Sequence, residues 1–437
     1  MPNQPISIFW FRRDLRLEDN VGLVAALQSG LPVLPVFIFD PHILDKLPGN
    51  DARVTFIHSR LLVVQAQLEA LGSSLQVLHK TPKAAFKELM ENKPIKAVFT
   101  NRDYEPYAIQ RDKAIEHFLT KNQVTFHSFK DQVIFEQQEI VKNDGSPYVV
   151  YTAFKNKWLA SLSPELHLKS SDTNSYASNF FKTTAHPLPT LGALGFLEAT
   201  IKVPDATVTP EVIANYEATR NFPGIKQGTS RLGAHLRFGT VSIRELVMKA
   251  RESSNKTFLS ELIWREFFMQ ILWHFPHTVN TAFKSKYDRI TWRNNEAEFV
   301  KWCEGQTGYA LVDAGMRELN ATGFMHNRVR MLVASFLCKH LLIDWRWGEA
   351  YFAERLLDYD QAANVGNWQW AAGSGVDAAP YFRIFNPMTQ VEKFDKQKKY
   401  INRWVPELQE FTYTPMMVDH KLARQRCLQV YKVGLAQ

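Results

Sequence analysis

The chain has little of what would stabilise a small secreted protein or a membrane protein. Its 437 residues include only three cysteines, Cys303, Cys338 and Cys427, which are far apart and form no C-x-x-C pair. This excludes a disulfide scaffold and a cysteine zinc site. No run approaches the roughly 18 uncharged apolar residues of a membrane span, and the first residues lack the pattern of a signal peptide. We therefore expect a cytoplasmic protein that does not enter a membrane.

A glycine-rich dinucleotide motif is also missing where it would be expected. The first strand-to-helix loop, Trp10–Arg16, contains no G-x-G-x-x-G. Residues Gly373–Ala378 match G-x-G-x-x-A formally, but they follow a tryptophan-rich helical pattern and not a strand. The match is therefore rejected as a dinucleotide fingerprint.

What is present in the first 130 residues is an alternation of short apolar runs and longer amphipathic stretches. This alternation predicts βαβ units, and so a doubly wound parallel sheet with helices on both faces. The runs expected to form strands are Ile6–Phe11, Val33–Phe39, Ala97–Thr100 and Val124–Phe129; helical spacing appears over Asp19–Ser29, Arg53–Leu71, Lys80–Glu91 and Glu105–Lys121.

The rest of the chain changes in pattern and in charge. Residues 131–205 are mixed and polar, and we expect a long interdomain connector there. From 206 to 437 the patterns are helical, which predicts an all-α C-terminal domain after the α/β N-terminal domain of residues 1–130. Residues 206–437 contain 30 basic and 23 acidic residues, against 22 and 21 before them. This bias favours an anionic partner, nucleic acid first, although a merely soluble basic surface would look the same.

Three polar segments in the helical half are candidate sites. Gly228–Gly233 precedes a short helical run, so its Thr, Ser and Arg231 could bind phosphate or simply cap the helix. On the predicted helix 261–268, Glu261, Trp264 and Arg265 share one face, which suits a surface that grips a nucleobase or an exposed salt-bridged edge. In the third segment, 326–331, Arg330 could pair with the downstream Asp358-Tyr359-Asp360.

Most of the eleven tryptophans fall in this helical half. Trp368 and Trp370 stand two residues apart, so in a helix their rings point in nearly opposite directions. We expect one to touch a buried group while the other lines a cavity. Core filling explains several of the others.

These motifs together resemble the photolyase/cryptochrome family. The segments that carry the resemblance, in order along nearly the full chain, are Trp10–Arg16, Gly228–Leu232, Glu261–Phe268, His326–Met331 and Asn364–Trp370. Residues Asp377–Pro387 look most like the class I cyclobutane pyrimidine dimer photolyases. The resemblance implies light-dependent DNA repair by a carbon–carbon lyase that holds FAD in its helical domain.

The resemblance also assigns roles to particular residues. It implies that the flavin phosphates and ring are bound by Tyr216, Thr229, Ser230, Arg231, Leu232, Gly233, Arg330, Asp358, Asp360 and Asn364. Asn364 would face the flavin N5 atom, where an amide can accept or donate a hydrogen bond as the redox state changes. Trp368, Trp345 and Trp292 match an electron-transfer chain from flavin to surface.

The implied partner is double- or single-stranded DNA that contains pyrimidine dimers. A dimer would flip out of the duplex into a cavity, as in other enzymes that work on a base. The residues expected at the lesion or its flanking phosphates are Arg220, Glu261, Trp264, Arg265, Asn327, Arg328, Met331, Trp370 and Arg383. A buried, protonated Glu261 could donate a hydrogen bond to the base. The family suggests a monomer.

Two alternatives remain open from sequence. The run Tyr104–Gln110 departs from that of relatives which bind methenyltetrahydrofolate. It therefore favours a deazaflavin or another flavin as a second, antenna chromophore, or an empty site.

The main rival function is a cryptochrome, a blue-light receptor without repair activity. Asn364 and Trp370 favour repair, because plant-type cryptochromes tend to have Asp and Tyr at these places. A light-independent flavoprotein or a plain DNA-binding module would leave the ordered tryptophans unexplained.

Overall fold

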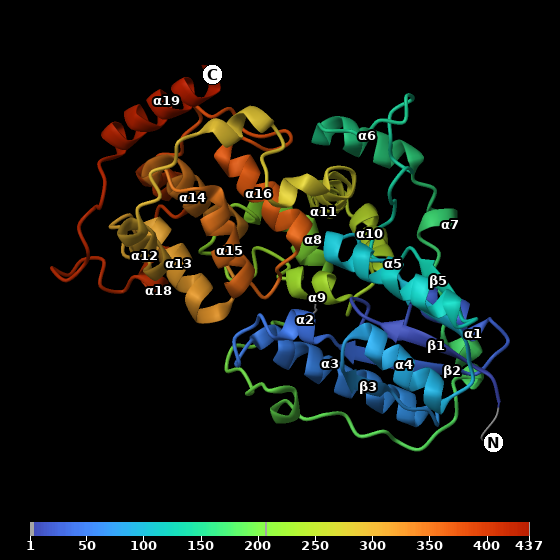
Figure 1. Ribbon diagram of the computed structural model, residues 1–437. Helices are drawn as coiled ribbons and strands as arrows, with labels where there is room; N and C mark the ends of the chain where they lie inside the picture. Colours follow the sequence, from blue (N-terminus) through green and yellow to red (C-terminus); the bar gives the residue numbers. More distant parts are fainter. Residues whose placement is uncertain (1–3, 206–207, 437) are drawn as a thin grey trace. The chain divides into compact units, whose positions relative to one another are not determined.

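The computed structural model describes residues 4–205 and 208–436 (Figure 1). The chain forms two compact units, which we call the α/β unit and the helical unit. The α/β unit comprises residues 1–136, 162–206 and 232–249, and the helical unit comprises 137–161, 207–231 and 250–437. The residues of the predicted connector are thus shared between the two units. The domain limits at 130 and 205 stay a prediction.

The α/β unit contains a five-stranded parallel sheet in the order β3-β2-β1-β4-β5. The strands are β1 (Ile6–Phe11), β2 (Val33–Phe39), β3 (Gln76–His79), β4 (Ile95–Asn101) and β5 (Thr125–Phe129). The predicted doubly wound sheet is confirmed. The sequence analysis missed β3, which has only four residues and a polar residue at each end.

Side chains alternate along β1 between two hydrophobic layers. Ile6, Ile8 and Trp10 belong to one buried cluster, whereas Phe9 and Phe11 belong to another. Because successive strand residues point to opposite faces, both faces of the sheet are covered, as in other parallel sheets. Phe180, from the predicted connector, pairs with Val33 and is only 1% exposed, so this part of the connector is packed.

Four helices of the α/β unit, at residues 21–27, 52–70, 82–92 and 106–121, follow the four predicted stretches closely, whereas those at 41–44, 164–167, 174–179 and 192–194 were not predicted. Their bounds are α1 (Val21–Leu27), α2 (Pro41–Leu44), α3 (Ala52–Ala70), α4 (Pro82–Asn92), α5 (Pro106–Lys121), α7 (Pro164–His167), η1 (Asn174–Asn179), η2 (Gly192–Leu194), α9 (Gly233–Phe238) and α10 (Ile243–Glu252), of which the last residues are grouped with the helical unit. Side chains that cap N-termini explain several helix starts, among them Asn20 at α1 and Asp51 at α3.

A buried ionic cluster stabilises the α/β unit. Asp131 is 1% exposed and accepts hydrogen bonds from Arg16 at 2.7 Å and from Arg244 at 2.8 Å. Arg244 also pairs with Asp19. Burial alone would raise the pKa of Asp131, but the two arginines hold it below its usual value.

The helical unit is built from helices, as predicted. Their bounds are α6 (Tyr151–Ser161), α8 (Pro210–Thr219), α11 (Thr257–His274), η3 (Pro276–Val279), η4 (Ser285–Arg289), α12 (Glu296–Glu304), α13 (Ala310–Thr322), α14 (Asn327–Ser335), the π-helical η5 (Phe336–Leu341), α15 (Trp345–Arg355), α16 (Gln361–Ala372), α17 (Pro387–Phe394), α18 (Lys399–Trp404) and α19 (His420–Ala436).

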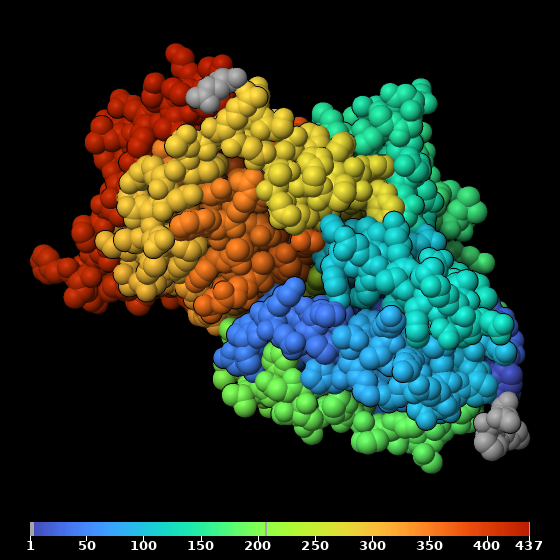
Figure 2. Space-filling view, viewed as in Figure 1, coloured from blue at the N-terminus to red at the C-terminus, as the bar shows by residue number. Residues whose placement is uncertain are grey.

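The core of the helical unit lies around α13, α14, η5, α15 and α16. At one point α15 and α16 approach closely, because residue 348 is glycine. A Cβ atom there would lie 2.1 Å from the Trp368 ring, a distance no side chain tolerates. In the space-filling view, the segment between α18 and α19 projects as a red arm, and Phe411 in this segment is fully exposed (Figure 2).

Candidate functional site: a cavity in the helical unit

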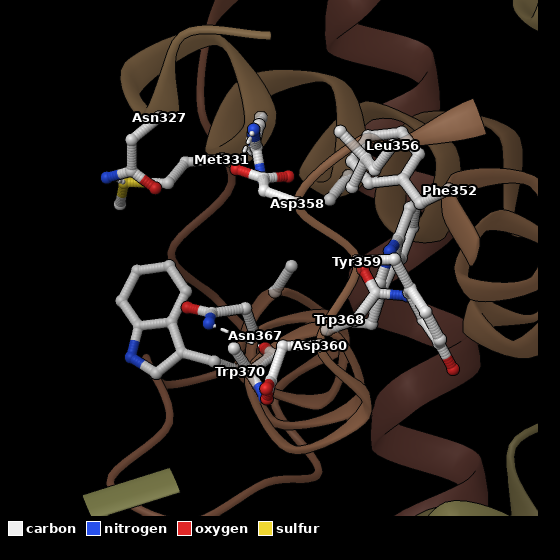
Figure 3. Close-up of a pocket in the computed structure, with 15 residues that line it drawn as sticks. Asn327, Met331, Phe352, Leu356, Asp358, Tyr359, Asp360, Asn367, Trp368 and Trp370 are labelled. Carbon is white, nitrogen blue, oxygen red and sulfur yellow. Dashed lines mark hydrogen bonds and ion pairs between the residues drawn. The ribbon is translucent and has the colours of Figure 1, made fainter. Parts of the chain in front are cut away.

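A cavity of about 600 Å³, counted out to its open mouth, lies in the helical unit. Its wall comes from α14, the end of α15, the following turn and α16. Figure 3 shows the labelled lining residues, with Asn327, Met331 and Trp370 at one end and Phe352, Leu356 and Tyr359 at the other. All of these residues belong to the helical unit.

Helical periodicity explains how α16 lines the cavity. Asp360 caps the helix N-terminus with its side chain, and Ala363, Asn364, Asn367 and Trp368 follow at spacings of three and four residues. This stripe mixes small, amide and aromatic side chains. On α14, Asn327, Arg330, Met331 and Ala334 form a similar stripe. The alanines in these stripes leave room for a flat group.

An ion pair predicted from the sequence stands in the cavity wall. Arg330 donates to Asp358 Oδ2 at 3.0 Å and to the Met325 carbonyl oxygen at 2.7 Å. The second carboxylate oxygen, Asp358 Oδ1, is buried and has no hydrogen-bond partner among the described residues. A buried acceptor without a donor is costly. It fits a ligand that brings an N–H or O–H group, such as the flavin ring or its ribityl chain.

Asn364 is 9% exposed and lines the same cavity. Its amide nitrogen donates to two acceptors of Glu349, the backbone oxygen at 3.1 Å and Oε1 at 2.9 Å. Burial raises the pKa of Glu349, while hydrogen bonds from Asn364 and Tyr359 oppose the rise. The sequence analysis missed Glu349, because no motif signals a contact across fifteen residues and two helices.

Three residues predicted to bind the lesion, Asn327, Met331 and Trp370, lie together at one end of the cavity (Figure 3). The Met331 sulfur lies 3.9 Å from both the Asn327 amide nitrogen and Arg328 Nη1. Arg328 also bonds Asn221 and lies over the Phe394 ring at 4.3 Å. An amide, a thioether and an indole form a mixed polar and apolar mouth that suits a pyrimidine pair.

The predicted residues on α11 do not line the cavity. Glu261 is ion-paired with Arg220. Burial raises the pKa of Glu261, and the Arg220 charge opposes this rise. Trp264 stacks on Tyr151, with ring centroids 3.6 Å apart and planes at 8°. Tyr151 had no sequence signal, because it comes from α6, more than a hundred residues away. Arg265 follows on the same helix and is half-buried.

The predicted phosphate segment spans the boundary between the units. Thr229, Ser230 and Arg231 belong to the helical unit, whereas Leu232 and Gly233 begin the stretch assigned to the α/β unit. Arg231 has a left-handed backbone (φ 52°), which is unusual for a residue with a side chain and often marks a functional loop. Its guanidinium lies 4.7 Å from the Phe324 ring, which Arg330 also approaches at 5.8 Å.

Tyr216 lies on α8, edge-on to Phe258 at 5.2 Å. Burial raises the pKa of the Tyr216 hydroxyl to about 12, so this hydroxyl stays protonated at neutral pH.

Two further predicted residues lie elsewhere in the helical unit. Arg383 has an exposed side chain, and its backbone oxygen accepts a hydrogen bond from the buried Lys339 at 2.9 Å. The Asp360 side chain accepts from the Ala363 amide at 3.2 Å.

The three tryptophans of the predicted electron-transfer chain belong to one aromatic core. Trp368 and Trp345 are each 2% exposed, and the half-buried Trp292 packs against the same cluster. The ring contacts of Trp368 are with Phe352 at 5.0 Å and Trp302 at 6.1 Å. Trp292 lies 6.1 Å from Tyr431. The expectation that one of Trp368 and Trp370 touches a buried group while the other lines a cavity is met in part, because Trp368 is buried but also reaches the cavity wall that Trp370 lines.

The α/β unit has a second polar cluster, around Trp10. The guanidinium groups of Arg12 and Arg111 lie 4.9 and 5.0 Å from the centre of its ring. Arg12 pairs with Asp112. The buried Trp10 Nε1 atom has no hydrogen-bond partner among the described residues.

Among residues 4–205 and 208–436, no three His, Cys, Asp or Glu side chains are grouped so that they could hold a metal ion. No described helix is both long and apolar enough to cross a membrane.

With the geometry established, comparison with known proteins gives the class. Residues 7–171 match the family model described as DNA photolyase, and residues 258–413 match the one described as the FAD binding domain of DNA photolyase. The chain belongs to the DNA photolyase family.

Individual relatives agree over nearly the full length. A deoxyribodipyrimidine photo-lyase of Synechococcus is 38% identical over 92% of this chain and 88% of the relative. The crystal structure of a bacterial class III photolyase from Agrobacterium tumefaciens has a TM-score of 0.88 at 34% identity, covering 100% of this chain and 98% of that one. An archaeal photolyase from Sulfolobus tokodaii, solved with two FAD molecules, has a TM-score of 0.83 at 33% identity, covering 98% and 99%.

Proposed function

We propose that this protein is a light-dependent DNA repair lyase that uses FAD to split cyclobutane pyrimidine dimers. The observation that carries the proposal is the cavity itself. One end presents Asn327, Met331 and Trp370, and its wall presents the open Asp358 carboxylate and Asn364. Relatives named deoxyribodipyrimidine photo-lyase match over most of the chain.

The residues of the cavity fit FAD. Arg330, Asp358, Asp360 and Asn364 would hold its ring and ribityl chain, and Tyr216 with Thr229–Gly233 its phosphates. When bound, reduced and excited by light, the flavin would supply the electron that opens the cyclobutane ring and would take it back afterwards, so that repair involves no net oxidation or reduction. The protein residues bind, orient and exclude water.

The lesion would enter at the Met331 end. Trp370 and Trp264 would contact the two fused bases, while Asn327 would hydrogen-bond a base edge. Glu261, which is ion-paired with Arg220, would hydrogen-bond a base. Arg265, Arg328 and Arg383 would contact flanking phosphates, which position DNA without reading its sequence. Flipping is less costly for a dimer than for intact bases, because a damaged base is already poorly stacked.

We further propose a relay through Trp368, Trp345 and Trp292, which would return oxidised flavin to its active state. The Trp10 cluster is the proposed site of a second, light-collecting chromophore, a flavin or deazaflavin in preference to a folate. The neighbour from Sulfolobus tokodaii, solved with two FAD molecules, supports a flavin as the second chromophore. A cytoplasmic monomer that acts on dimer-containing DNA completes the proposal.

The decisive experiment illuminates the purified, flavin-reduced protein with an oligonucleotide that contains one thymine dimer. We expect the dimer to be converted to two thymines in the light and to persist in the dark, as measured by chromatography. The rival cryptochrome function predicts a light-driven change in the flavin spectrum with no loss of dimers. An absorption spectrum of the same sample would show any second chromophore.

A further inference from the structure

A long loop in the helical unit joins α16 to α17. It covers residues 373–386 and contains no helix or strand. Loops of this length without secondary structure are uncommon in compact domains and usually carry function. The middle of the loop faces solvent, where Phe382 is 59% exposed and the Arg383 side chain is exposed. Holding these side chains in one conformation needs contacts that offset the lost conformational entropy.

Three contacts hold the loop against the helices around it. Near its start, the Asp377 carboxylate accepts a hydrogen bond from the first backbone amide of α6 at 3.1 Å. Further along, the Tyr381 ring stacks on a tyrosine of α19, with centroids 5.6 Å apart and planes at 12°. The Arg383 amide donates to the Pro380 carbonyl oxygen at 2.9 Å, which closes a turn. The third contact is to this turn, because Lys339 Nζ donates to the Arg383 carbonyl oxygen at 2.9 Å.

Lys339 is an unusual residue to bury. It is 2% exposed, and burial lowers its pKa to about 8, so it is mostly charged at neutral pH. The thiols beside it, Cys338 and Cys427, have pKa values that burial raises, and so they stay neutral. Within residues 4–205 and 208–436, its one hydrogen bond is to Arg383 and it forms no ion pair. A buried charge without a counter-charge costs stability, so the fold gains little from this ammonium group.

The backbone that carries Lys339 is also irregular. Lys339 lies in η5, a π-helix in which all six residues are buried. Short π-helical segments are rare and are frequently found at functional sites. A buried ammonium cannot itself reach a phosphate at the surface. Any surface contact that Lys339 influences is therefore made by the loop it holds.

We propose that Lys339 is a positioning residue that fixes the turn at Arg383 from beneath, so that this arginine is held ready for a DNA phosphate. The inference rests on the proposed function, in which Arg383 contacts a phosphate beside the lesion. The hydrogen bond ends on the backbone of Arg383 and fixes the base of the side chain, while the guanidinium stays exposed. A contact group that is ordered before binding raises affinity, because less entropy is lost when the ligand arrives.

The first test measures the loop without DNA. Lys339→Met keeps the length and the apolar stem of the side chain but removes the ammonium group. Hydrogen exchange of the Arg383 amide should become about tenfold faster, while exchange in α13 and α14 stays within about twofold of native. The midpoint of urea unfolding should not fall, because a buried charge has been removed. Lys301→Met, at an exposed lysine on α12, is the matched control and should leave exchange in the loop unchanged.

The second test measures binding to an oligonucleotide that contains one thymine dimer. In Lys339→Met the affinity should fall about tenfold, because the phosphate contact is no longer ordered beforehand. The slope of log affinity against log salt should become shallower by about one unit, as for the loss of one phosphate contact. Lys301→Met removes the same charge and should keep the slope. In an Arg383→Ala background, Lys339→Met should cost less than about twofold in affinity.

Two kinds of result would overturn the proposal. One is a folded Lys339→Met protein in which either loop exchange or DNA affinity stays native. The other is an equal loss of affinity with and without Arg383, which would show that Lys339 does not act through this arginine. If Lys339→Met fails to fold, Lys339→Gln replaces it, since its shorter side chain loses the same hydrogen bond.

These outcomes are separable from that of the repair assay. Native protein that binds DNA and shows the expected changes in Lys339→Met, but leaves dimers intact, would overturn the repair function and support the role of Lys339. Native protein that repairs dimers, with loop exchange and affinity insensitive to Lys339, would do the reverse. A native chain that binds neither damaged nor undamaged DNA would overturn both.

Discussion

Two carboxylates, one in each unit, show how the same chemical group serves two purposes. Asp131 in the α/β unit is enclosed by Arg16 and Arg244, and both of its oxygens are bonded. Asp358 in the helical unit has one oxygen on Arg330 and the other without a partner in a cavity wall. A closed cluster leaves no buried charge unpaired and is costly to break, whereas an open one costs stability until a ligand completes it.

The largest expected effect is on the closed cluster. Asp131→Asn leaves Arg16 and Arg244 buried without their shared counter-charge, and we expect the free energy of unfolding to fall by about 3–5 kcal/mol. Urea denaturation followed by circular dichroism measures this. Asp144→Asn, a change at an exposed aspartate, is the control and should leave the midpoint unchanged. A loss below 1 kcal/mol would show that the cluster contributes little to the fold.

Mild acid should lower the stability of the helical unit before it lowers that of the α/β unit. Burial first, then the nearby charges of His420 and Arg426, lowers the pKa of His340 to about 3, and burial with Arg330 lowers that of His326 to about 4. The unfolded chain binds these protons near pH 6.5, so stability falls as pH drops below 6.5, by about 2 kcal/mol per histidine at pH 5. The pKa of Asp131 is lowered in the folded state, so its contribution to stability is retained above about pH 4 and is lost only at lower pH.

The measurement is acid titration by tryptophan fluorescence, because every tryptophan except Trp10 belongs to the helical unit. Hydrogen exchange of β1 and β4 reports the α/β unit in parallel. His340→Gln should reduce the dependence of the fluorescence midpoint on pH between 6.5 and 5. If both units unfolded at the same pH, and if His340→Gln left that pH unchanged, the expectation would be contradicted.

The open carboxylate should matter for the ligand and little for the fold. Asp358→Asn keeps the size of the side chain but removes the charge that pairs with Arg330 at a half-exposed site. We expect at least a tenfold loss of FAD affinity, about 1.4 kcal/mol, with unfolding changed by less than about 1 kcal/mol. Flavin absorbance of the purified protein and its titration with FAD measure this. Full FAD retention would place the flavin elsewhere.

The smallest effect on stability is expected at Trp292. Trp292→Phe keeps an aromatic ring against the core but removes the easily oxidised indole, so photoreduction of oxidised flavin should slow at least tenfold. Dimer repair by chemically reduced protein should stay within twofold of native. Trp302→Phe is the matched control, since Trp302 touches Trp368 but is outside the proposed relay. Equal loss of both activities in Trp292→Phe would exclude the relay role.

The sequence predicted those features that depend on periodicity or on motif order. Four of the five strands, the parallel sheet and the helical half followed from spacing, and the Arg330–Asp358 pair from its motif. The contact of Glu349 with Asn364, and that of Tyr151 with Trp264, could not be predicted. Both join helices whose relative placement is decided by packing, which a local pattern does not contain.

The bare backbone at Gly348 has a consequence for how this protein can vary. A single added methyl group there would meet the Trp368 indole and would wedge α15 away from α16. That displacement would withdraw the oxygen that holds Asn364 and would loosen the first indole of the proposed relay. The absence of a side chain at residue 348 thus links the contact that orients Asn364 to the position of Trp368, so a substitution there would alter both.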